Sequence, residues 1–348
     1  MSGKVLILGG SGFIGRRLAQ RLLAGGALQP VVASRHAGLR LDVTDAPALA
    51  SALRGMDAVV NAVAGSERAI AQGAQALAQA VQSLTEGARG VRGAEGAPGL
   101  RVIHISSMAV LGEREGRLDE TAAPGPTRAW YARAKQQAEA CMAGLARAGT
   151  PVAVLRPGCV WGPGSTLWVS RMARWLQDGR LGDLGEHGDG WTNGVHVDDV
   201  CQAIEALLAA PSWSPGVGLF HLAAPDSPRW NTYFRDMALA LGATPLRRIA
   251  PLRLRLDAWL AGPPLHVAGR LLARGADGAD PSMHLPPPLS PGLLRLFARQ
   301  QRLVSERATS QLGLRWTPYA TALHQGLAAL ESRGSRSALA RNTGLPIT

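Results

Sequence analysis

Cysteine is scarce in this chain, which has 348 residues and only Cys141, Cys159 and Cys201. Their number is odd, and no two of them lie at the C-x-x-C spacing typical of zinc or redox sites. We therefore expect reduced thiols, with neither a disulfide framework nor a metal centre. Met1 leads straight into an apolar segment, which leaves no room for a secretion signal, so we expect a cytoplasmic protein.

Aromatic residues and long apolar runs are also few. Phe, Trp and Tyr make up 5% of the residues, which argues against a surface that stacks nucleic-acid bases. No apolar run is long enough to cross a bilayer. The formal charge of +12 comes from basic residues scattered along the chain. We interpret it as a solvated surface and predict no nucleic-acid partner, while contact with an anionic membrane surface is disfavoured but stays an open alternative.

What is abundant is glycine, and its first cluster is informative. Lys4–Leu8 is apolar and β-branched, as in a buried parallel strand, and Gly9, Gly12 and Gly15 follow it at G-x-x-G-x-x-G spacing. Arg16–Ala24 then has a helical pattern. The first glycine permits a tight turn, the second lets phosphates approach the backbone, and the third lets the helix pack closely on the strand. The segment predicts a dinucleotide pyrophosphate site.

Strands and helices alternate through the first half of the chain. Strands are predicted over 4–8, 30–35, 39–45, 57–61, 101–107 and 152–156, and helices over 16–24, 46–54, 67–86 and 128–148. This alternation predicts an α/β fold, a doubly wound parallel (Rossmann) sheet with ligands at the carboxyl ends of its strands.

The second half is more irregular, with expected helices at 198–209, 230–241 and 321–330, and a strand at 217–222. We predict a dinucleotide-binding Rossmann domain over 1–157, a smaller substrate lobe over 158–332 with strands returning to the sheet, and a disordered tail over 333–348. Residues 87–99 are expected to form a surface loop. Residues 246–274 mix leucine with arginine, as in an ordinary lobe or a helical lid.

The second chemical signal is Tyr131-Ala-Arg-Ala-Lys135 near the start of a predicted helix. Residues four apart share one helix face, and an ammonium beside a phenol is expected to lower the phenol pKa from about 10. Such a tyrosine can exchange a proton with a substrate oxygen while hydride moves at the same carbon. Ser107 ends the fifth predicted strand, so its hydroxyl can meet the same oxygen.

Together these segments resemble the extended short-chain dehydrogenase/reductase family, which contains NAD-dependent epimerases, dehydratases and reductases. The resemblance runs from Lys4 to about Leu330. The motifs that carry it occur in family order: Gly9-Gly-Ser-Gly12-Phe-Ile-Gly15, Asp42-Val-Thr-Asp45, Asn61-Ala-Val-Ala64, Ser106-Ser107, Tyr131-Ala-Arg-Ala-Lys135, Arg156-Pro-Gly-Cys-Val-Trp-Gly-Pro163 and His196-Val-Asp-Asp-Val200.

The resemblance implies a catalytic triad of Ser107, Tyr131 and Lys135, with Lys135 also holding the nicotinamide ribose. His196 and Asp199 are expected to be structural, and dimerisation through two helices per subunit, which is common in the family, makes a homodimer possible. The implied cofactor-binding residues are Gly9, Gly12, Phe13, Ile14, Gly15, Ser34, Arg35, Asp42, Val43, Ala62, Val63, Ala64, Lys135, Pro157, Gly158 and Val160.

The residues after the second strand bear on which cofactor is used. NAD sites place a carboxylate there for the ribose 2′-hydroxyl, whereas this chain has Ser34-Arg35-His36. A guanidinium suits a 2′-phosphate in charge and in geometry. We therefore favour NADP(H) over NAD(H), and the alternative is that Arg35 stacks on adenine in an NAD site.

Two departures from the family's motifs argue against some of the reactions found in the family. Met108-Ala109 follows Ser107 where 4,6-dehydratases carry Asp-Glu, and Thr192 to His196 lacks the arginine with which sugar-nucleotide enzymes grip a diphosphate. We predict an NADP(H)-dependent oxidoreductase that interconverts a ketone or aldehyde and an alcohol. Its small-molecule substrate is expected to be apolar or ring-bearing, because four tryptophans lie between 161 and 191. The alternatives are an NAD-dependent sugar-nucleotide epimerase and a non-catalytic dinucleotide-binding module.

Overall fold

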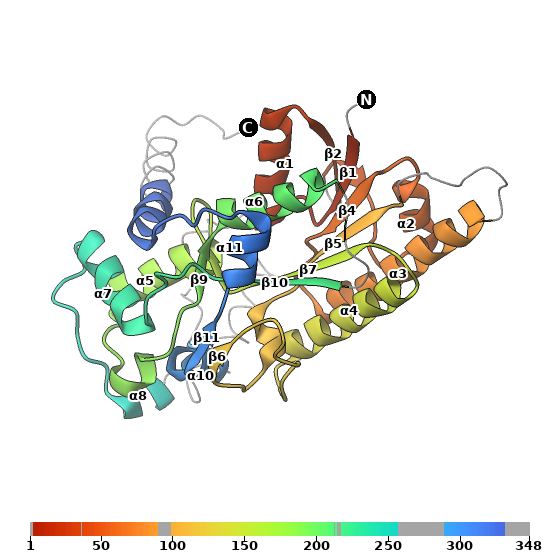
Figure 1. The fold of residues 1–348 in the computed structure, drawn as a ribbon. Helices are drawn as coiled ribbons and strands as arrows, with labels where there is room; N and C mark the ends of the chain where they lie inside the picture. The colour runs from red at the N-terminus through yellow and green to blue at the C-terminus, as the bar shows by residue number, and fades with distance from the viewer. Residues whose placement is uncertain are drawn as a thin grey trace, which may run out of the picture. The chain divides into compact units, whose positions relative to one another are not determined.

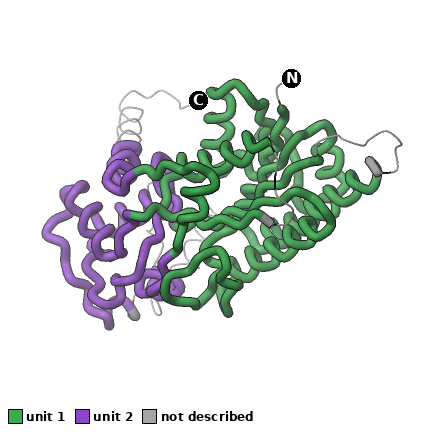
Figure 2. The backbone as a smooth tube through the Cα atoms, in the orientation of Figure 1, with its two compact units in different colours: residues 1–158, 195–225, 303–317 green, residues 159–194, 226–302, 318–348 purple. Residues whose placement is uncertain are grey.

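The computed structural model describes residues 3–35, 37–89, 99–211, 213, 217–256 and 289–330. The chain forms two compact units, coloured separately in Figure 2. The short strands β9 (Gly194–His196) and β11 (Gln301–Leu303) lie where the chain passes from one unit to the other. Unit 1 comprises Met1–Gly158, Val195–Pro225 and Leu303–Thr317, and unit 2 comprises Cys159–Gly194, Asp226–Arg302 and Pro318–Thr348.

Unit 1 is built on a parallel sheet. Within the described residues seven strands pair in the order β10-β7-β5-β4-β1-β2-β3 (Figure 1), and every pair is parallel. The order reverses between β1 and β4, which is where a doubly wound sheet binds its ligand. The predicted doubly wound fold is confirmed. The strands are β1 (Gly3–Leu8), β2 (Leu28–Ser34), β3 (Leu39–Arg40), β4 (Ala58–Asn61), β5 (Arg101–Ile105), β7 (Val152–Pro157) and β10 (Val217–Leu222).

Helices cover both faces of this sheet (Figure 1). Leu6 and Leu8 point into a core made with α2, α3 and α4, while the alternate residues Val5 and Ile7 are buried on the other face. There α1 and α6 pack together. The helices of unit 1 are α1 (Phe13–Gly25), α2 (Ala46–Leu53), α3 (Glu67–Arg89), the 3-10 turn η1 (Met108–Leu111), α4 (Trp130–Arg147), α6 (Val197–Ala209) and α11 (Glu306–Leu312), and the short strand β6 (Gly116–Leu118) belongs to the same unit.

Two strands are shorter than predicted by two residues or more, and polar side chains explain both. The third was expected to run to residue 45, but β3 ends at Arg40. Asp42 accepts hydrogen bonds from Thr44, and Asp45 caps α2 by accepting from Ala48 N at 3.0 Å. The fifth strand was expected to run to residue 107, but Ser107 instead caps η1.

Unit 2 is held together by aromatic packing. Trp230, Tyr233, Phe234 and Phe297 are all fully buried, and the rings of Trp230 and Phe297 lie 4.7 Å apart. Its elements are β8 (Cys159–Trp161), the π-helical turn η2 (Thr166–Ser170), α5 (Arg171–Gln177), the 3-10 turn η3 (Gly185–Gly188), α7 (Trp230–Ala240), α8 (Pro251–Leu256), α10 (Pro291–Ala298) and a helix over 319–330.

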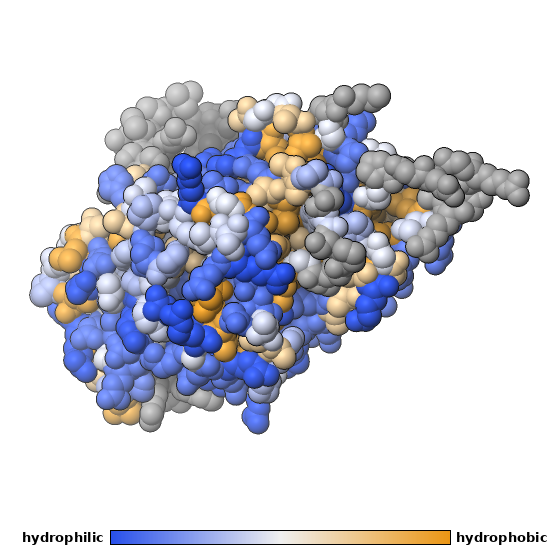
Figure 3. Space-filling model, viewed as in Figure 1, coloured by the Kyte–Doolittle hydropathy of each residue, from blue (hydrophilic) through white to orange (hydrophobic). Residues whose placement is uncertain are grey.

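Three predicted segments fall wholly or partly outside the described residues. They are 90–98 of the expected loop, 257–274 of the leucine- and arginine-rich segment, and the expected tail at 333–348. The face of the molecule in Figure 3 is largely hydrophilic, with apolar residues scattered over it. Among the helices that the structure describes, none has the length and apolar character needed to cross a membrane.

Candidate active site

The glycine-rich turn connects β1 to α1, and the glycines are needed for different reasons. Gly9 has a φ of +74°, and a Cβ atom on it would lie 2.7 Å from Ala62 O. A Cβ atom on Gly15 would lie 2.5 Å from Gly9 O, so α1 can approach the turn only because Gly15 has no side chain. Gly12 is the N-cap of α1, and Phe13 and Ile14 begin the helix.

The N-terminus of α1 is suited to an anion. No side chain caps it, and no acidic residue lies in its first turn. The first N–H groups of a helix lack partners within the helix, and the helix dipole favours negative charge beside them. Around Gly12 a Cβ atom would meet only Gly9 O, at 3.1 Å. The residues at this turn therefore fit the pyrophosphate of a dinucleotide.

The residues expected on the adenosine side follow β2 and β4. Ser34 is buried, and its hydroxyl donates to Ala37 O at 2.8 Å, so it shapes the turn that carries Arg35. Hydrogen bonds from Thr44 lower the pKa of Asp42, and the guanidinium charges of Arg68 and Arg35 act in the same direction. The charges of Arg35, after β2, and of Arg68 therefore act on the segment after β3 that carries Asp42 and Val43.

The end of β4 is tied to both neighbouring strands and to α4. Ala62 N donates to Leu8 O at 3.0 Å, and Val63 N donates to the Asn61 side chain at 3.2 Å. Val63 O in turn accepts a hydrogen bond from Lys135 Nζ at 3.3 Å. Ala62, Val63 and Ala64 therefore lie beside the glycine turn, at the point where the strand order reverses.

Ser107, Tyr131 and Lys135 come together in unit 1. Ser107 follows β5, and the other two project from the first two turns of α4. The Ser107 hydroxyl lies close enough to the Tyr131 phenol to lower the pKa of that phenol. Lys135 Nζ donates to Ile105 O at 2.7 Å as well as to Val63 O, so the ammonium joins the ends of β5 and β4.

The electrostatics of this group differ from expectation. Burial raises the pKa of Tyr131, and this effect outweighs the lowering by the Ser107 hydroxyl. The expectation that Lys135 lowers the pKa of this phenol is wrong, because its ammonium is directed at backbone carbonyls. Burial also lowers the pKa of Lys135, to about 8. At neutral pH the tyrosine is therefore a neutral phenol and the lysine is still cationic.

Glu139 belongs to this site and was missed from the sequence. It lies on the same face of α4 as Tyr131 and Lys135, because the three residues are spaced four apart. Its carboxylate accepts from Ser106 Oγ at 2.5 Å and from two nitrogens of Arg156 at 2.9 and 2.7 Å. The ion pair is nearly buried, with 4% of the Arg156 side chain exposed. The i+8 spacing from Tyr131 was the available signal.

The residues expected beside the nicotinamide follow β7. Pro157 ends that strand opposite Leu222 of β10, and Gly158 N donates to Leu222 O at 2.9 Å. Val160 belongs to unit 2, where Val160 O accepts from Ser165 Oγ at 3.0 Å.

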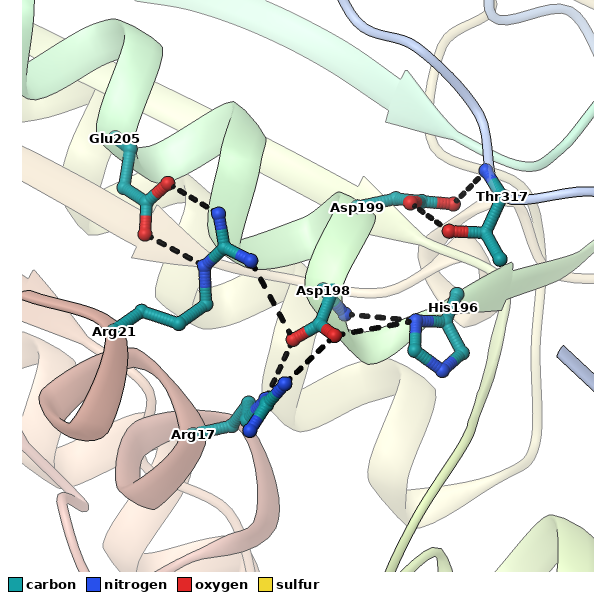
Figure 4. Close-up of polar contacts among 7 residues, drawn as sticks. All are labelled: Arg17, Arg21, His196, Asp198, Asp199, Glu205 and Thr317. Carbon is teal, nitrogen blue, oxygen red and sulfur yellow. Dashed lines mark hydrogen bonds and ion pairs between the residues drawn. The ribbon is translucent and has the colours of Figure 1, made fainter. Parts of the chain in front are cut away.

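The His196 motif builds a polar network in unit 1 (Figure 4). The His196 ring accepts from Asp198 N and so caps α6. Asp198 binds Arg17 of α1 at 2.6 Å. Asp199 accepts from Thr317 N at 3.0 Å and from Thr317 Oγ1 at 2.6 Å. These contacts fasten α6 to α1 and to the segment after α11. In the part of the chain that is described, no group of acidic, His or Cys side chains could hold a metal ion.

Residues 5–221 match the sequence pattern of the NAD dependent epimerase/dehydratase family. The chain belongs to this family. The chain is 33% identical to Protein YeeZ of Escherichia coli (strain K12) over 145 residues. The aligned region covers 42% of this chain and 47% of that relative, so the chain spans about half of the relative's length. A second relative is 2-alkyl-3-oxoalkanoate reductase of Stenotrophomonas maltophilia (strain K279a), with 30% identity over 61% of this chain and 67% of the other.

A solved structure shows the shared fold. UDP-glucuronic acid 4-epimerase from Bacillus cereus, determined with UDP-glucuronic acid and NAD, matches with a TM-score of 0.67 at 17% identity. The match covers 94% of this chain and 99% of the epimerase. The family is described as NAD dependent, and this chain has the glycine turn, the uncapped helix and the buried lysine that fit such a cofactor.

Proposed function

We propose that this protein is an NADP(H)-dependent oxidoreductase that interconverts a ketone or aldehyde and an alcohol on a small, apolar or ring-bearing substrate. The observation that carries the proposal is the position of Tyr131 on α4, close to the Ser107 hydroxyl and one helical turn before the buried Lys135, whose Nζ donates to Ile105 O at 2.7 Å. A neutral phenol is a proton donor, which is what the reduction of a carbonyl requires. The similarity to 2-alkyl-3-oxoalkanoate reductase supports the same chemistry.

Each side chain has a defined task. Ser107 donates a hydrogen bond to the substrate carbonyl oxygen and polarises the carbon, and Tyr131 delivers its hydroxyl proton to that oxygen. Lys135, whose ammonium is directed at the backbone carbonyls after β4 and at the end of β5, would hold the nicotinamide ribose. A bound nicotinamide cofactor supplies the hydride. The glycine turn, Arg35 and Lys135 would hold the cofactor.

The preference for NADP(H) rests on Arg35. The positive environment after β2 has no carboxylate in the place that binds a ribose 2′-hydroxyl, and a guanidinium there matches a 2′-phosphate. Arg35→Asp should reverse the preference, with weaker NADPH binding and stronger NADH binding in fluorescence titrations. An unchanged ratio of the two affinities would assign Arg35 to adenine stacking.

The first test is to denature the purified protein, identify any dinucleotide it releases, and titrate the emptied protein with NADPH and NADH. Preference for NADPH supports a reductase, whereas stoichiometric NAD that resists exchange would support a sugar-nucleotide epimerase. Tyr131→Phe should lower kcat for a ketone panel by about 10²- to 10⁴-fold with NADPH affinity nearly unchanged. Equal turnover by the variant would remove Tyr131 from the mechanism.

A further inference from the structure

Ser107 lies in a segment that α4 holds on both sides. Two residues before it, Ile105 O accepts a hydrogen bond from Lys135 Nζ at 2.7 Å. Three residues after it, Val110 O accepts one from Gln136 Nε2 at 2.8 Å. Lys135 already belongs to the candidate site, whereas Gln136 has no part in the proposed chemistry. Its hydrogen bonds therefore call for an explanation.

Gln136 uses both hydrogens of its side-chain nitrogen. Besides Val110 O, Nε2 donates to Gly125 O at 2.7 Å. A Gln amide nitrogen carries two N–H groups, so backbone carbonyls occupy both of them. Gly125 N in turn donates to Val110 O at 3.0 Å. One partly buried side chain thus joins α4 to two backbone segments that are also bonded to each other.

The two segments meet backbone to backbone, with no room for a side chain at the contact. A Cβ atom on Gly125 would collide with Leu111 O, and one on Gly112 would collide with Pro126 O. Gly112 also has a φ of +60°, which favours glycine. The contact is therefore closely packed, and Gln136 fixes it to α4.

The turn η1 carries this restraint to Ser107. Val110 N donates to Ser107 O at 3.2 Å, and Ser107 Oγ accepts from Ala109 N at 3.2 Å. A hydroxyl oxygen that accepts a backbone hydrogen bond still has its own proton to donate. The turn thus determines where the Ser107 hydroxyl lies, and that hydroxyl is close enough to Tyr131 to lower the pKa of its phenol.

We propose that Gln136 is a positioning residue, which holds the Ser107 hydroxyl against the Tyr131 phenol by fixing η1 to α4. The task of that hydroxyl on a substrate carbonyl rests on the proposed function. Its placement beside Tyr131 rests on the contacts of Gln136 alone. A misplacement of about 1 Å can lower a rate by about 10²-fold, so a side chain that never touches the substrate can still limit turnover.

The test is a pH titration of Tyr131, followed by fluorine NMR in the full chain labelled with meta-fluorotyrosine. The chain has three tyrosines, and Tyr131→Phe assigns the Tyr131 resonance. Burial raises the pKa of Tyr233 and of Tyr319, so their resonances report whether a variant is folded. Ser107→Ala should raise the titration midpoint of Tyr131, because the Ser107 hydroxyl lowers the pKa of that phenol.

Gln136→Met should raise the same midpoint, by up to the shift seen in Ser107→Ala. The double variant should show no larger shift than Ser107→Ala alone, because Gln136 acts through that hydroxyl. Gln137→Met is the matched control, since Gln137 is the next residue of α4 and is exposed. Its midpoint should equal that of the wild type.

Two results of the titration would overturn the proposal. One is a wild-type midpoint in Gln136→Met, and the other is a double variant in which the two shifts add. If Gln136→Met does not fold, Gln136→Asn gives the same comparison, because its shorter side chain withdraws the amide from both carbonyls.

Turnover separates this inference from the proposed function. With NADPH and a panel of acetophenone, benzaldehyde and cyclohexanone, Gln136→Met should lower kcat by about 10- to 100-fold and leave KM for NADPH unchanged. A wild-type kcat in this variant would overturn the proposal. A wild-type chain that reduces none of the three compounds would count against the proposed function alone, because the Tyr131 titration needs no turnover.

Discussion

Two arginines of unit 1, Arg156 and Arg21, are held in a different way from three arginines of unit 2, Arg171, Arg229 and Arg302. In unit 1 the guanidiniums of Arg156 and Arg21 each meet a carboxylate at 2.7 Å. In unit 2 Arg171 lies over Trp175, and Arg229 and Arg302 lie over Trp191 with Cζ 4.7 and 4.2 Å from its centroid. Charge-assisted hydrogen bonds fix both partners in one geometry, whereas a ring face holds a guanidinium without requiring a carboxylate partner.

The carboxylate contacts of unit 1 match the work proposed for that unit. Glu139 joins Arg156 of β7 to Ser106, which follows β5 and directly precedes Ser107, and it lies on the same helix face as Lys135. A proton donor must be held within tenths of an ångström of its acceptor, so a rigid network suits it.

The largest predicted effect concerns the ion pair of Arg156 and Glu139. Arg156→Met should lower the free energy of unfolding by about 3–5 kcal/mol, because it leaves the nearly buried carboxylate of Glu139 without its cation. Arg171→Met should change it by less than about 0.5 kcal/mol or raise it, because no charge loses a partner. Urea unfolding curves measure both. Similar losses in the two variants would show that Arg171 is paired in solution.

Glycines give the next largest effect. A Cβ atom on Gly15 meets backbone, at 2.5 Å from Gly9 O, whereas one on Gly194 meets the Trp161 ring at 2.0 Å. Each alanine substitution should lower the free energy of unfolding by about 1–3 kcal/mol, but only Gly15→Ala should also abolish NADPH binding in a fluorescence titration. Gly144→Ala is the control, because nothing lies within 4 Å of that position. Normal NADPH affinity in Gly15→Ala would contradict the assignment of the turn.

The sequence predicted the parts of the site that depend on local spacing. The glycine turn and the Tyr131–Lys135 pair are each encoded within a few residues. The turn therefore predicted a parallel sheet, and the spacing of Tyr131 and Lys135 predicted that they share one face of a helix. Arg156 and Ser106 reach Glu139 from two strands, and only the folded sheet brings these together. Likewise the direction of the Tyr131 pKa shift was mispredicted, because burial is a property of tertiary packing.

A pH profile sharpens the role of the unit 1 network. Catalysis that needs the Lys135 ammonium should decline as pH rises through about 8, because burial lowers its pKa to that value. The negative charge of Glu139 acts in the opposite direction and raises the pKa of Lys135. Glu139→Gln should therefore move the alkaline limb of the kcat/KM profile to lower pH. Glu113→Gln, at an exposed position, should leave the limb in place. If the alkaline limb of the Glu139→Gln profile lies at the same pH as in the wild type, Glu139 has a structural role only.

The smallest effect is expected for the ion pair of Arg17 and Asp198, which lies near the surface of unit 1. Arg17 and Asp198 form a bidentate pair across α1 and α6 (Figure 4), but 43% of the Arg17 side chain is exposed. Arg17→Ala should lower the free energy of unfolding by only about 0.5 kcal/mol, since solvent and salt screen such a pair. A double-mutant cycle with Asp198→Ala at low and high salt measures the coupling. The coupling energy of Arg17 and Asp198 should be small and should fall as salt is added. If it were as large as the loss of unfolding free energy in Arg156→Met, and independent of salt, burial would not determine how much an ion pair stabilises unit 1.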